Sequence, residues 1–193
     1  MAIYSAESSR LYLQKLDIEE HLQSYHELIK EPRAMMWSMR SPTTSLSESL
    51  QNMREYTPTL EKPWNQHWAI MLKDKDLDSR SASRPRLIGI VGIPREAEMG
   101  YRIHPDHWGK GYMSEALTLF VEMWWGLEAS QKYSQLLAAA DPGNLASTRI
   151  LIKNGFKKGE YKKDFYTRAS LGGHVKSDLQ FFYLDRPSKS ENI

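Results

Sequence analysis

The sequence predicts a mixed α/β (α+β) fold with a mostly antiparallel central sheet of about six to seven strands, flanked by about four helices. Strand and helix periodicities follow one another in the order β α α β β β α β α β β, which is not a regular βαβ alternation. Three consecutive strands favour an antiparallel meander, and the helix after them forms a crossover. The length of 193 residues fits one domain, which we expect over residues 1–187, with a polar tail at 188–193.

The N-terminal part of the chain is predicted to hold one strand and two helices. Apolar and polar residues alternate over residues 9–16, which is typical of a strand. Asp17 is a suitable N-cap for a helix that ends before Pro32. Ser45 and Glu48 have the spacing of a capping box, which predicts the start of a second helix.

The middle of the chain is predicted to form the meander. Its strands cover residues 67–72, 86–93 and 96–104, and the charged, Ser-rich stretch 73–86 is predicted to be a long hairpin loop. A third helix begins near Gly109 to Met113, because apolar residues then recur at helical spacing. Its apolar face is Met113, Leu117, Phe120/Val121 and Trp124.

The last part of the chain is predicted to hold three strands and one helix. The strands cover residues 136–140, 156–166 and 178–184. Asn144 can cap the helix between the first two, and Gly155 can follow its last turn as the C′ residue.

Composition excludes several classes of protein. With no cysteine, the chain has no disulfide framework, thiolate metal site or cysteine nucleophile. The net charge of +2 is too balanced for a nucleic-acid partner. Apolar runs stay well short of the ~18 residues of a membrane span, and the N-terminus lacks the pattern of a signal peptide. We therefore expect a cytoplasmic protein with no membrane partner, and a nuclear location remains open.

The stretch 98–116 carries the chemistry. A strand enters a loop with Gly109 and Gly111, and the loop opens an amphipathic helix. The first N–H groups of that helix, its dipole and Lys110 form an anion site suited to a pyrophosphate. The pattern fits neither a Walker A loop nor a dinucleotide fingerprint after the first strand, and a lone GxG is also typical of an ordinary tight turn.

Four segments in order resemble one family. The run His107-Trp108-Gly109-Lys110-Gly111-Tyr112-Met113, followed by Ser114-Glu115-Ala116, resembles the acyl-CoA loop of the GNAT superfamily of N-acetyltransferases, in the form found in the ribosomal-protein N-terminal acetyltransferase (Rim-type) branch. Ser9 to Leu13 resembles its opening R-L-x-L strand, and Ala97 to Tyr101 its A-E-I-G-Y strand. The segment from Asn144 to Phe156 resembles its N-x-x-S-x-x-x-x-x-K-x-G-F helix. The resemblance spans residues 9 to about 184, and its element order is the order predicted above.

The resemblance implies acetyl-CoA as co-substrate. No metal site is expected, because the Pro105 loop between His104 and His107 is not helical and no carboxylate cluster accompanies these histidines. It implies contacts to acetyl-CoA from Ile103, His104, Trp108, Gly109, Lys110, Gly111, Tyr112, Met113, Ser114 and Asn144. A strand N–H near Ile103 or His104 is implied to stabilise the oxyanion. Met113 is bulkier than the small residue usual at its position, and we expect its contact to run through the backbone N–H.

The resemblance also implies two catalytic residues. Glu98 is the candidate base that removes a proton from the amine, against the alternative of a solvated strand glutamate. Many GNAT enzymes carry a tyrosine that protonates the departing thiolate, but its position here holds Leu151, so Ser147 is the candidate substitute. His104 is a weaker candidate base, since its unperturbed pKa suits the task without establishing it.

Two functions follow. The first is an N-acetyltransferase that moves an acetyl group to a primary amine, on a small molecule or a protein N-terminus, by direct attack in a ternary complex. The second is a catalytically weak acyl-CoA-binding regulatory module. Met35, Met36, Trp37 and Met39 lie in the segment that shapes the acceptor pocket of relatives, although such residues are equally ordinary in a core. The acceptor, the acyl-chain preference and the oligomeric state stay open, with a homodimer possible.

Overall fold

A computed structural model describes residues 4–73, 87–172 and 175–188. They form one sheet of eight strands in the order β1-β2-β3-β4-β5-β6-β8-β7, together with five α-helices. The strands are β1 (Tyr4–Glu7), β2 (Leu11–Lys15), β3 (His67–Leu72), β4 (Leu87–Arg95), β5 (Glu98–Ile103), β6 (Gln135–Ala140), β7 (Lys157–Thr167) and β8 (Lys176–Asp185). The helices are α1 (Ile18–Lys30), α2 (Pro32–Met35), α3 (Leu46–Arg54), α4 (Tyr112–Gly126) and α5 (Leu145–Lys153), with short 3₁₀ turns η3 (Pro105–His107), η4 (Glu128–Ser130) and η5 (Ala169–Leu171).

The predicted fold class is confirmed, but the expected numbers of strands and helices were too low. The added strand, β1, has four residues, too few for a pattern of alternation to be recognised. The added helix, α2, is a single turn that begins at Pro32. The same proline therefore follows one helix and opens the next, because its missing N–H is tolerated at a helix start.

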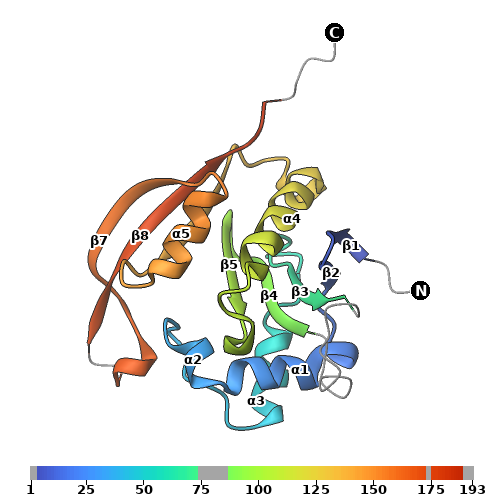
Figure 1. Cartoon of the computed structure of the whole chain (residues 1–193), viewed down its shortest axis with the longest axis vertical. Coiled ribbons are helices and arrows are strands. Elements are labelled where there is room, and N and C mark those ends of the chain that lie inside the picture. The colour runs from blue at the N-terminus through green and yellow to red at the C-terminus, as the bar shows by residue number, and fades with distance from the viewer. Residues whose placement is uncertain (1–3, 74–86, 173–174, 189–193) are drawn as a thin grey trace.

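The sheet separates two apolar cores. On one face, α4 and α5 pack on alternate strand residues such as Leu11, Leu13 and Ile70. On the other face, α1 to α3 pack on the residues between them, such as Tyr12 and Met71. Figure 1 shows α4 and α5 in front of the sheet, with the β7–β8 ribbon beside α5 on the side opposite β1.

Hydrogen bonds at the helix ends confirm the predicted caps. Ser45 accepts the N–H of Glu48 at 3.2 Å, and the Glu48 carboxylate accepts the N–H of Thr44 at 2.7 Å. Asn144 Oδ1 accepts the N–H of Ser147 at 3.1 Å. Gly155 follows α5 with φ of +85°, the left-handed conformation expected of a C′ glycine.

The meander is confirmed as well, since β3 pairs antiparallel with β4 and β4 with β5.

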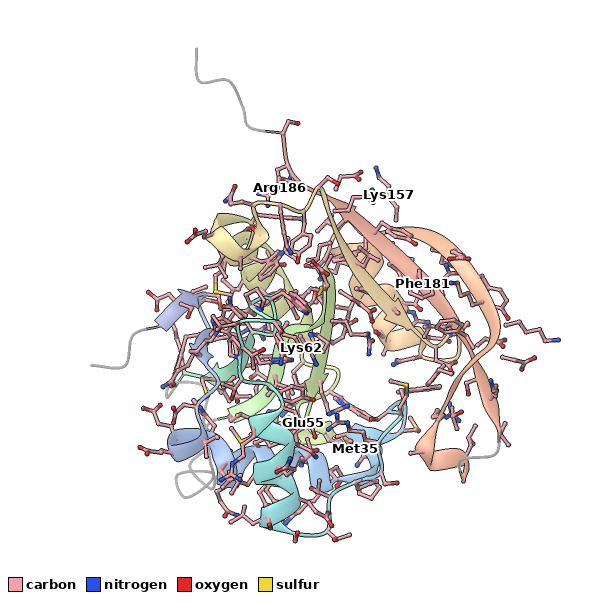
Figure 2. All side chains as sticks on the ribbon, turned by 180° about the vertical axis from the view of Figure 1, so that it is seen from behind. Met35, Glu55, Lys62, Lys157, Phe181 and Arg186 are labelled. Carbon is pink, nitrogen blue, oxygen red and sulfur yellow. The ribbon has the colours of Figure 1, made fainter. Side chains whose placement is uncertain are left out.

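Arg186, the residue after β8, holds the end of that strand against η4 (Figure 2). Its guanidinium donates to the carbonyl of Trp125 at 3.2 Å and to Ser130 Oγ at 3.0 Å, and it stacks on the Trp125 ring.

Two expectations fall partly outside the described residues. The predicted loop 73–86 does so from residue 74 onward, and the predicted tail does so from residue 189. The single-domain boundaries remain a prediction. In the part of the chain that the structure describes, each helix is too short or too polar to cross a membrane.

Candidate acyl-CoA site

The loop between β5 and α4 passes twice through left-handed backbone. Gly109 and Gly111 have φ of +73° and +78°, a region in which a Cβ would be strained. Gly111 is the N-cap residue of α4, and its carbonyl accepts the N–H of Glu115 at 3.1 Å. Within the described residues, the N–H groups of residues 109–114 have no acceptor. Unpaired N–H groups at a helix N-terminus can bind an anion, so this geometry is compatible with the predicted anion site.

The side chains of this loop and of the first turn of α4 differ in their exposure. Tyr112 and Met113 are buried in the core beneath α4, so the size of Met113 does not obstruct the N–H groups. The side chain of Trp108 is exposed, and its Nε1 donates to the carbonyl of Ile103 at 3.0 Å. Lys110 is exposed, and Ser114 Oγ accepts a bond from Asn154 at 3.4 Å.

The strands β5 and β6 are parallel neighbours over two residue pairs only. The pairs are Glu98 with Leu137 and Met99 with Ala138, and the carbonyl of Ala97 accepts the N–H of Leu137 at 2.7 Å. Farther along, β6 pairs with β8 up to Ala140, while β5 keeps its partner β4 on the other side. The two strands therefore part after Met99, next to the loop that leads into α4.

Strand alternation decides which backbone groups line this opening. The N–H of His104 donates to Ile88 of β4 at 2.8 Å. Neighbouring residues of an antiparallel strand point their N–H groups in opposite directions. The N–H of Ile103 therefore points toward β6, into the opening. Of the two N–H groups that the sequence proposed for the oxyanion, only that of Ile103 is available, because His104 is engaged.

Ser147 meets a tyrosine at the same opening. Tyr101 OH lies 2.6 Å from Ser147 Oγ and 3.3 Å from the Ser147 carbonyl oxygen. Burial raises the pKa of Tyr101 to about 12, although the bond to Ser147 acts in the opposite direction. The phenol is therefore protonated at neutral pH. It joins β5 to the first turn of α5, which the side chain of Asn144 caps.

Glu98 lies on the other face of the sheet. Side chains alternate along a strand, and Tyr101 is three residues away from Glu98, so the two point to opposite faces. The Glu98 carboxylate pairs with Arg95, whose Nε donates to Oε2 at 3.0 Å, and its side chain is 14% exposed. The structure thus brings Ser147 and the Ile103 N–H to the opening and places Glu98 across the sheet from Ser147.

His104 serves the loop. Its Nδ1 accepts the N–H of Asp106 at 3.3 Å and caps η3. That bond requires an unprotonated Nδ1, and the His104 backbone N–H is already used. In this structure, His104 therefore caps the η3 turn.

A hollow of about 710 Å³ lies between the segment after α2 and the C-terminal end of β7. Its lining comes from the segment after α2 and from the end of β7 with η5: Met39, Ser41, Phe165, Tyr166, Thr167, Ala169 and Gly172. The two segments are joined, because Ala169 donates to the Ser38 carbonyl at 3.0 Å and Ser170 to the Met36 carbonyl at 2.8 Å. Of the four residues that the sequence proposed for the acceptor wall, Met39 lines this hollow, while Met35 is buried under α1 to α3.

A group of polar and aromatic side chains connects this hollow to the end of β6. Asp141 accepts from Tyr166 OH at 2.9 Å and lies 3.9 Å from Arg168, whose guanidinium stacks on Trp37. Burial raises the pKa of Tyr166, and the Asp141 carboxylate adds to the shift. The group holds the β7 end and the segment after α2 in a fixed position relative to the opening.

Comparison with protein families decides the classification. A family model described as an acetyltransferase (GNAT) domain matches residues 10–157. The chain belongs to the GNAT family. That match covers β5, the loop before α4 and the whole of α5, and it ends at Lys157, the first residue of β7.

Individual GNAT proteins resemble the chain over different lengths. "Uncharacterized N-acetyltransferase YoaA" of Bacillus subtilis is 28% identical over 120 residues, which cover 59% of this chain and 61% of that protein. The structure titled RimL, a ribosomal L7/L12 α-N-protein acetyltransferase in complex with coenzyme A, has a TM-score of 0.77 at 16% identity and covers 97% of this chain and all of that one. Spermidine N-acetyltransferase from Vibrio cholerae, in complex with CoA and spermine, has a TM-score of 0.71 at 16% identity, with 93% and 97% covered. At such identities, the two structures establish the shared GNAT fold.

One residue of the GNAT opening was not found from the sequence. Tyr101 belongs to the quoted A-E-M-G-Y segment, but it was used only for the resemblance. Its spacing of two from Met99 and Ile103 was the available signal, since it placed Tyr101 on the face that packs against α5. Leu151, where many GNAT enzymes carry a tyrosine, is fully buried in the core.

Proposed function

We propose that the chain is an acetyl-CoA-dependent N-acetyltransferase that moves an acetyl group to a primary amine by direct attack in a ternary complex. The observation that carries this proposal is the row of unpaired N–H groups at residues 109–114, beside the opening between β5 and β6. The row offers donors to the pyrophosphate of CoA, and we assign the extended arm that bears the thioester to the opening, where β5 and β6 no longer pair with each other. Asn144 is also proposed to contact acetyl-CoA. Its Oδ1 caps α5, and its Nδ2 group is the donor that we assign to this contact.

The backbone of β5 supplies the donor for the reacting carbonyl. The N–H of Ile103 points into the opening, and we assign it to the thioester oxygen. Negative charge grows on that oxygen as the amine attacks, and a fixed N–H stabilises it more than mobile water does. The bond from Trp108 to the Ile103 carbonyl holds this part of the strand in place.

Three proton transfers accompany the reaction. The ammonium form of the acceptor loses a proton to Glu98, directly or through water, before its nitrogen attacks the carbonyl carbon. When the tetrahedral intermediate collapses, the C–S bond breaks and the thiolate takes a proton from Ser147 Oγ. The attacking nitrogen gives up its second proton through water, and that proton replaces the one lost by Ser147. Tyr101 OH lies 2.6 Å from Ser147 Oγ, and we assign the donor role in this bond to Tyr101, which leaves the Ser147 proton for the thiolate. Glu98 and Ser147 act on opposite faces of the sheet. We assign the acceptor amine to the face of Glu98, and Ser147 acts on the face that carries α5.

The acceptor is proposed to be a small amine or a protein or peptide N-terminus that enters from the hollow near Met39. RimL acts on a protein N-terminus and the Vibrio cholerae relative on spermidine, so both classes occur among proteins of this fold. We also keep the expectations of a cytoplasmic location and a possible homodimer as proposals.

A second candidate is an acyl-CoA-binding regulatory module with weak catalysis. The observation in its favour is the combination of a buried Leu151 at the usual tyrosine position and a Glu98 carboxylate held by Arg95. Such a module binds CoA through the same loop and releases no thiol with any amine.

Calorimetric titration with acetyl-CoA, followed by thiol release with a panel of amines and N-terminal peptides, separates the two. We expect binding, with thiol release confined to one amine class. Binding without release from any amine supports the module, and absence of binding overturns both candidates.

A further inference from the structure

Arg10, the first residue of the R-L-x-L segment, reaches across the molecule to the loop that opens α4. Its Nη1 donates to the carbonyl of Lys110 at 3.1 Å. Its Nε and Nη2 donate to Glu115 Oε2 at 2.8 and 2.5 Å, and its guanidinium stacks on the Tyr112 ring. One side chain, from the residue before β2, therefore contacts the loop at Lys110 and the first turn of α4 at Tyr112 and Glu115.

The bond to Lys110 sets the direction of one peptide group. The peptide between Lys110 and Gly111 is trans, so its C=O and N–H point to opposite edges of the plane. Because the carbonyl points at Arg10, the N–H of Gly111 points away from it, to the outer side of the loop. Both residues that flank Lys110 are glycines with little conformational restraint of their own, so this peptide needs an external anchor.

Glu115 keeps the anchor in position. Burial by itself raises the pKa of Glu115, but the hydrogen bonds from Ser8 and Arg10 outweigh it and hold the pKa below its usual value. Ser8 Oγ donates to Glu115 Oε1 at 2.5 Å, so both carboxylate oxygens are engaged. The carboxylate stays ionised at neutral pH and fixes the plane of the guanidinium, leaving Nη1 aimed at the Lys110 carbonyl.

We propose that Arg10 is a positioning residue for the pyrophosphate site, which acts by orienting the Lys110–Gly111 peptide so that the Gly111 N–H faces the ligand. This inference rests on the proposed binding of CoA at this loop. It assigns a functional role to a residue that lies in the opening strand, about one hundred residues before the loop it orients.

The test compares two ligands that differ in the pyrophosphate. CoA contains it, and pantetheine has the same thiol arm without it. We expect Arg10→Met to raise the Kd of CoA, measured by titration calorimetry, about tenfold or more, as for the loss of a charged hydrogen bond. The inhibition constant of pantetheine, measured by displacement of acetyl-CoA, should stay within about twofold. Arg10→Lys keeps the charge, but an ammonium group cannot donate to the Lys110 carbonyl and the Glu115 carboxylate in one plane. The Kd of CoA for this variant should therefore lie between those of the wild type and Arg10→Met.

A double variant separates orientation from charge balance. If Arg10 merely neutralised Glu115, then Arg10→Met with Glu115→Met would regain the affinity of the wild type for CoA. We expect the double variant to bind as weakly as Arg10→Met. Arg40→Met is the matched control, because Arg40 forms a similar 2.5 Å ion pair with Glu55 away from the loop. Its affinity for CoA should equal that of the wild type.

Three results overturn the inference: an unchanged Kd of CoA in Arg10→Met, an equal loss of both ligands, or recovery in the double variant. Failure of the proposed function looks different. A wild-type protein that binds CoA and transfers no acetyl group removes the enzymatic activity and leaves the role of Arg10 intact. A wild-type protein that binds no CoA removes both.

Discussion

The acyl-CoA loop and the acceptor-side hollow are built in opposite ways. The loop offers backbone N–H groups from six consecutive residues, 109–114. The hollow is lined by side chains from the segment after α2, from β7 and from the η5 turn, more than one hundred residues apart in the chain.

This contrast separates what is general from what is specific in the molecule. A cradle of backbone groups depends on glycine positions and helix geometry, so many sequences can bind the same ligand with it. A wall of side chains changes with each substitution at Met39, Phe165 or Tyr166. We therefore expect variants of the loop to abolish ligand binding, and variants of the hollow to change acceptor preference.

The largest effect is expected from Gly111→Trp. The residue has φ of +78°, where an L side chain costs roughly 1–2 kcal/mol, and the new Cβ would lie 3.5 Å from Arg10 Nη2. We expect no measurable binding of CoA by calorimetry. Gly126→Ala, at the far end of α4 with open space around the new Cβ, is the control and should bind normally. Normal binding by Gly111→Trp would show that the loop does not hold the phosphates.

The next largest effect is expected from Glu98→Gln. If Glu98 is the base, turnover should fall about hundredfold or more while the Kd of CoA stays nearly constant. The amide keeps the shape of the side chain and can still accept from Arg95. Glu96→Gln, two residues earlier and paired with Lys132, is the control and should retain activity. Turnover of Glu98→Gln equal to wild type at every pH would remove Glu98 from the mechanism.

A smaller effect is expected from Tyr101→Phe. The variant keeps the ring and removes the hydroxyl bonded to Ser147, so kcat should fall about tenfold with CoA affinity unchanged. Ser147→Ala should lower kcat at least as much, and the double variant should equal Ser147→Ala, because groups that act as one unit are not additive. Additive losses would indicate that Tyr101 acts independently of Ser147.

The same contrast explains how far the sequence alone could be interpreted. The loop, the Asn144 cap and the strands around them follow from local patterns, and the structure confirms these elements. The pair of Tyr101 and Ser147 is 46 residues apart, and the oxyanion donor could be narrowed from two residues to Ile103 only after β4 fixed the register of β5. Contacts between distant segments, such as the bond between Tyr101 and Ser147, depend on packing and leave no periodic signal in the sequence.

A several-fold effect is expected from Met39→Trp. The larger side chain fills part of the hollow, so KM for the acceptor should rise while the Kd of CoA stays constant. Leu60→Trp, at a fully exposed position, is the control for an added indole. An unchanged KM would place the acceptor path elsewhere and weaken the division between the two regions.

The smallest effect at neutral pH is expected from replacing His67. Its effect on the free energy of unfolding should grow as the pH falls. Burial lowers the pKa of His67 from 6.5 to about 3, against a smaller opposing contribution from its hydrogen bond to the backbone of Tyr56, on which it stacks. The unfolded chain binds a proton below about pH 6.5 that the folded chain refuses until about pH 3. Stability is therefore lost as the pH falls through this window, by about 1.4 kcal/mol per pH unit.

His67→Gln removes this titration. The slope of unfolding free energy against pH, measured by urea denaturation between pH 7 and 4.5, should be shallower in the variant than in the wild type. Part of the slope should remain, because burial also lowers the pKa of His21. Since β3 lies between the two apolar cores, the acid-induced loss of stability should appear in α1 to α3 and in α4 together. Equal slopes in the two proteins would mean that His67 is hydrated in the folded chain. Loss confined to α1 to α3 would mean that the acceptor side unfolds independently of the acyl-CoA loop.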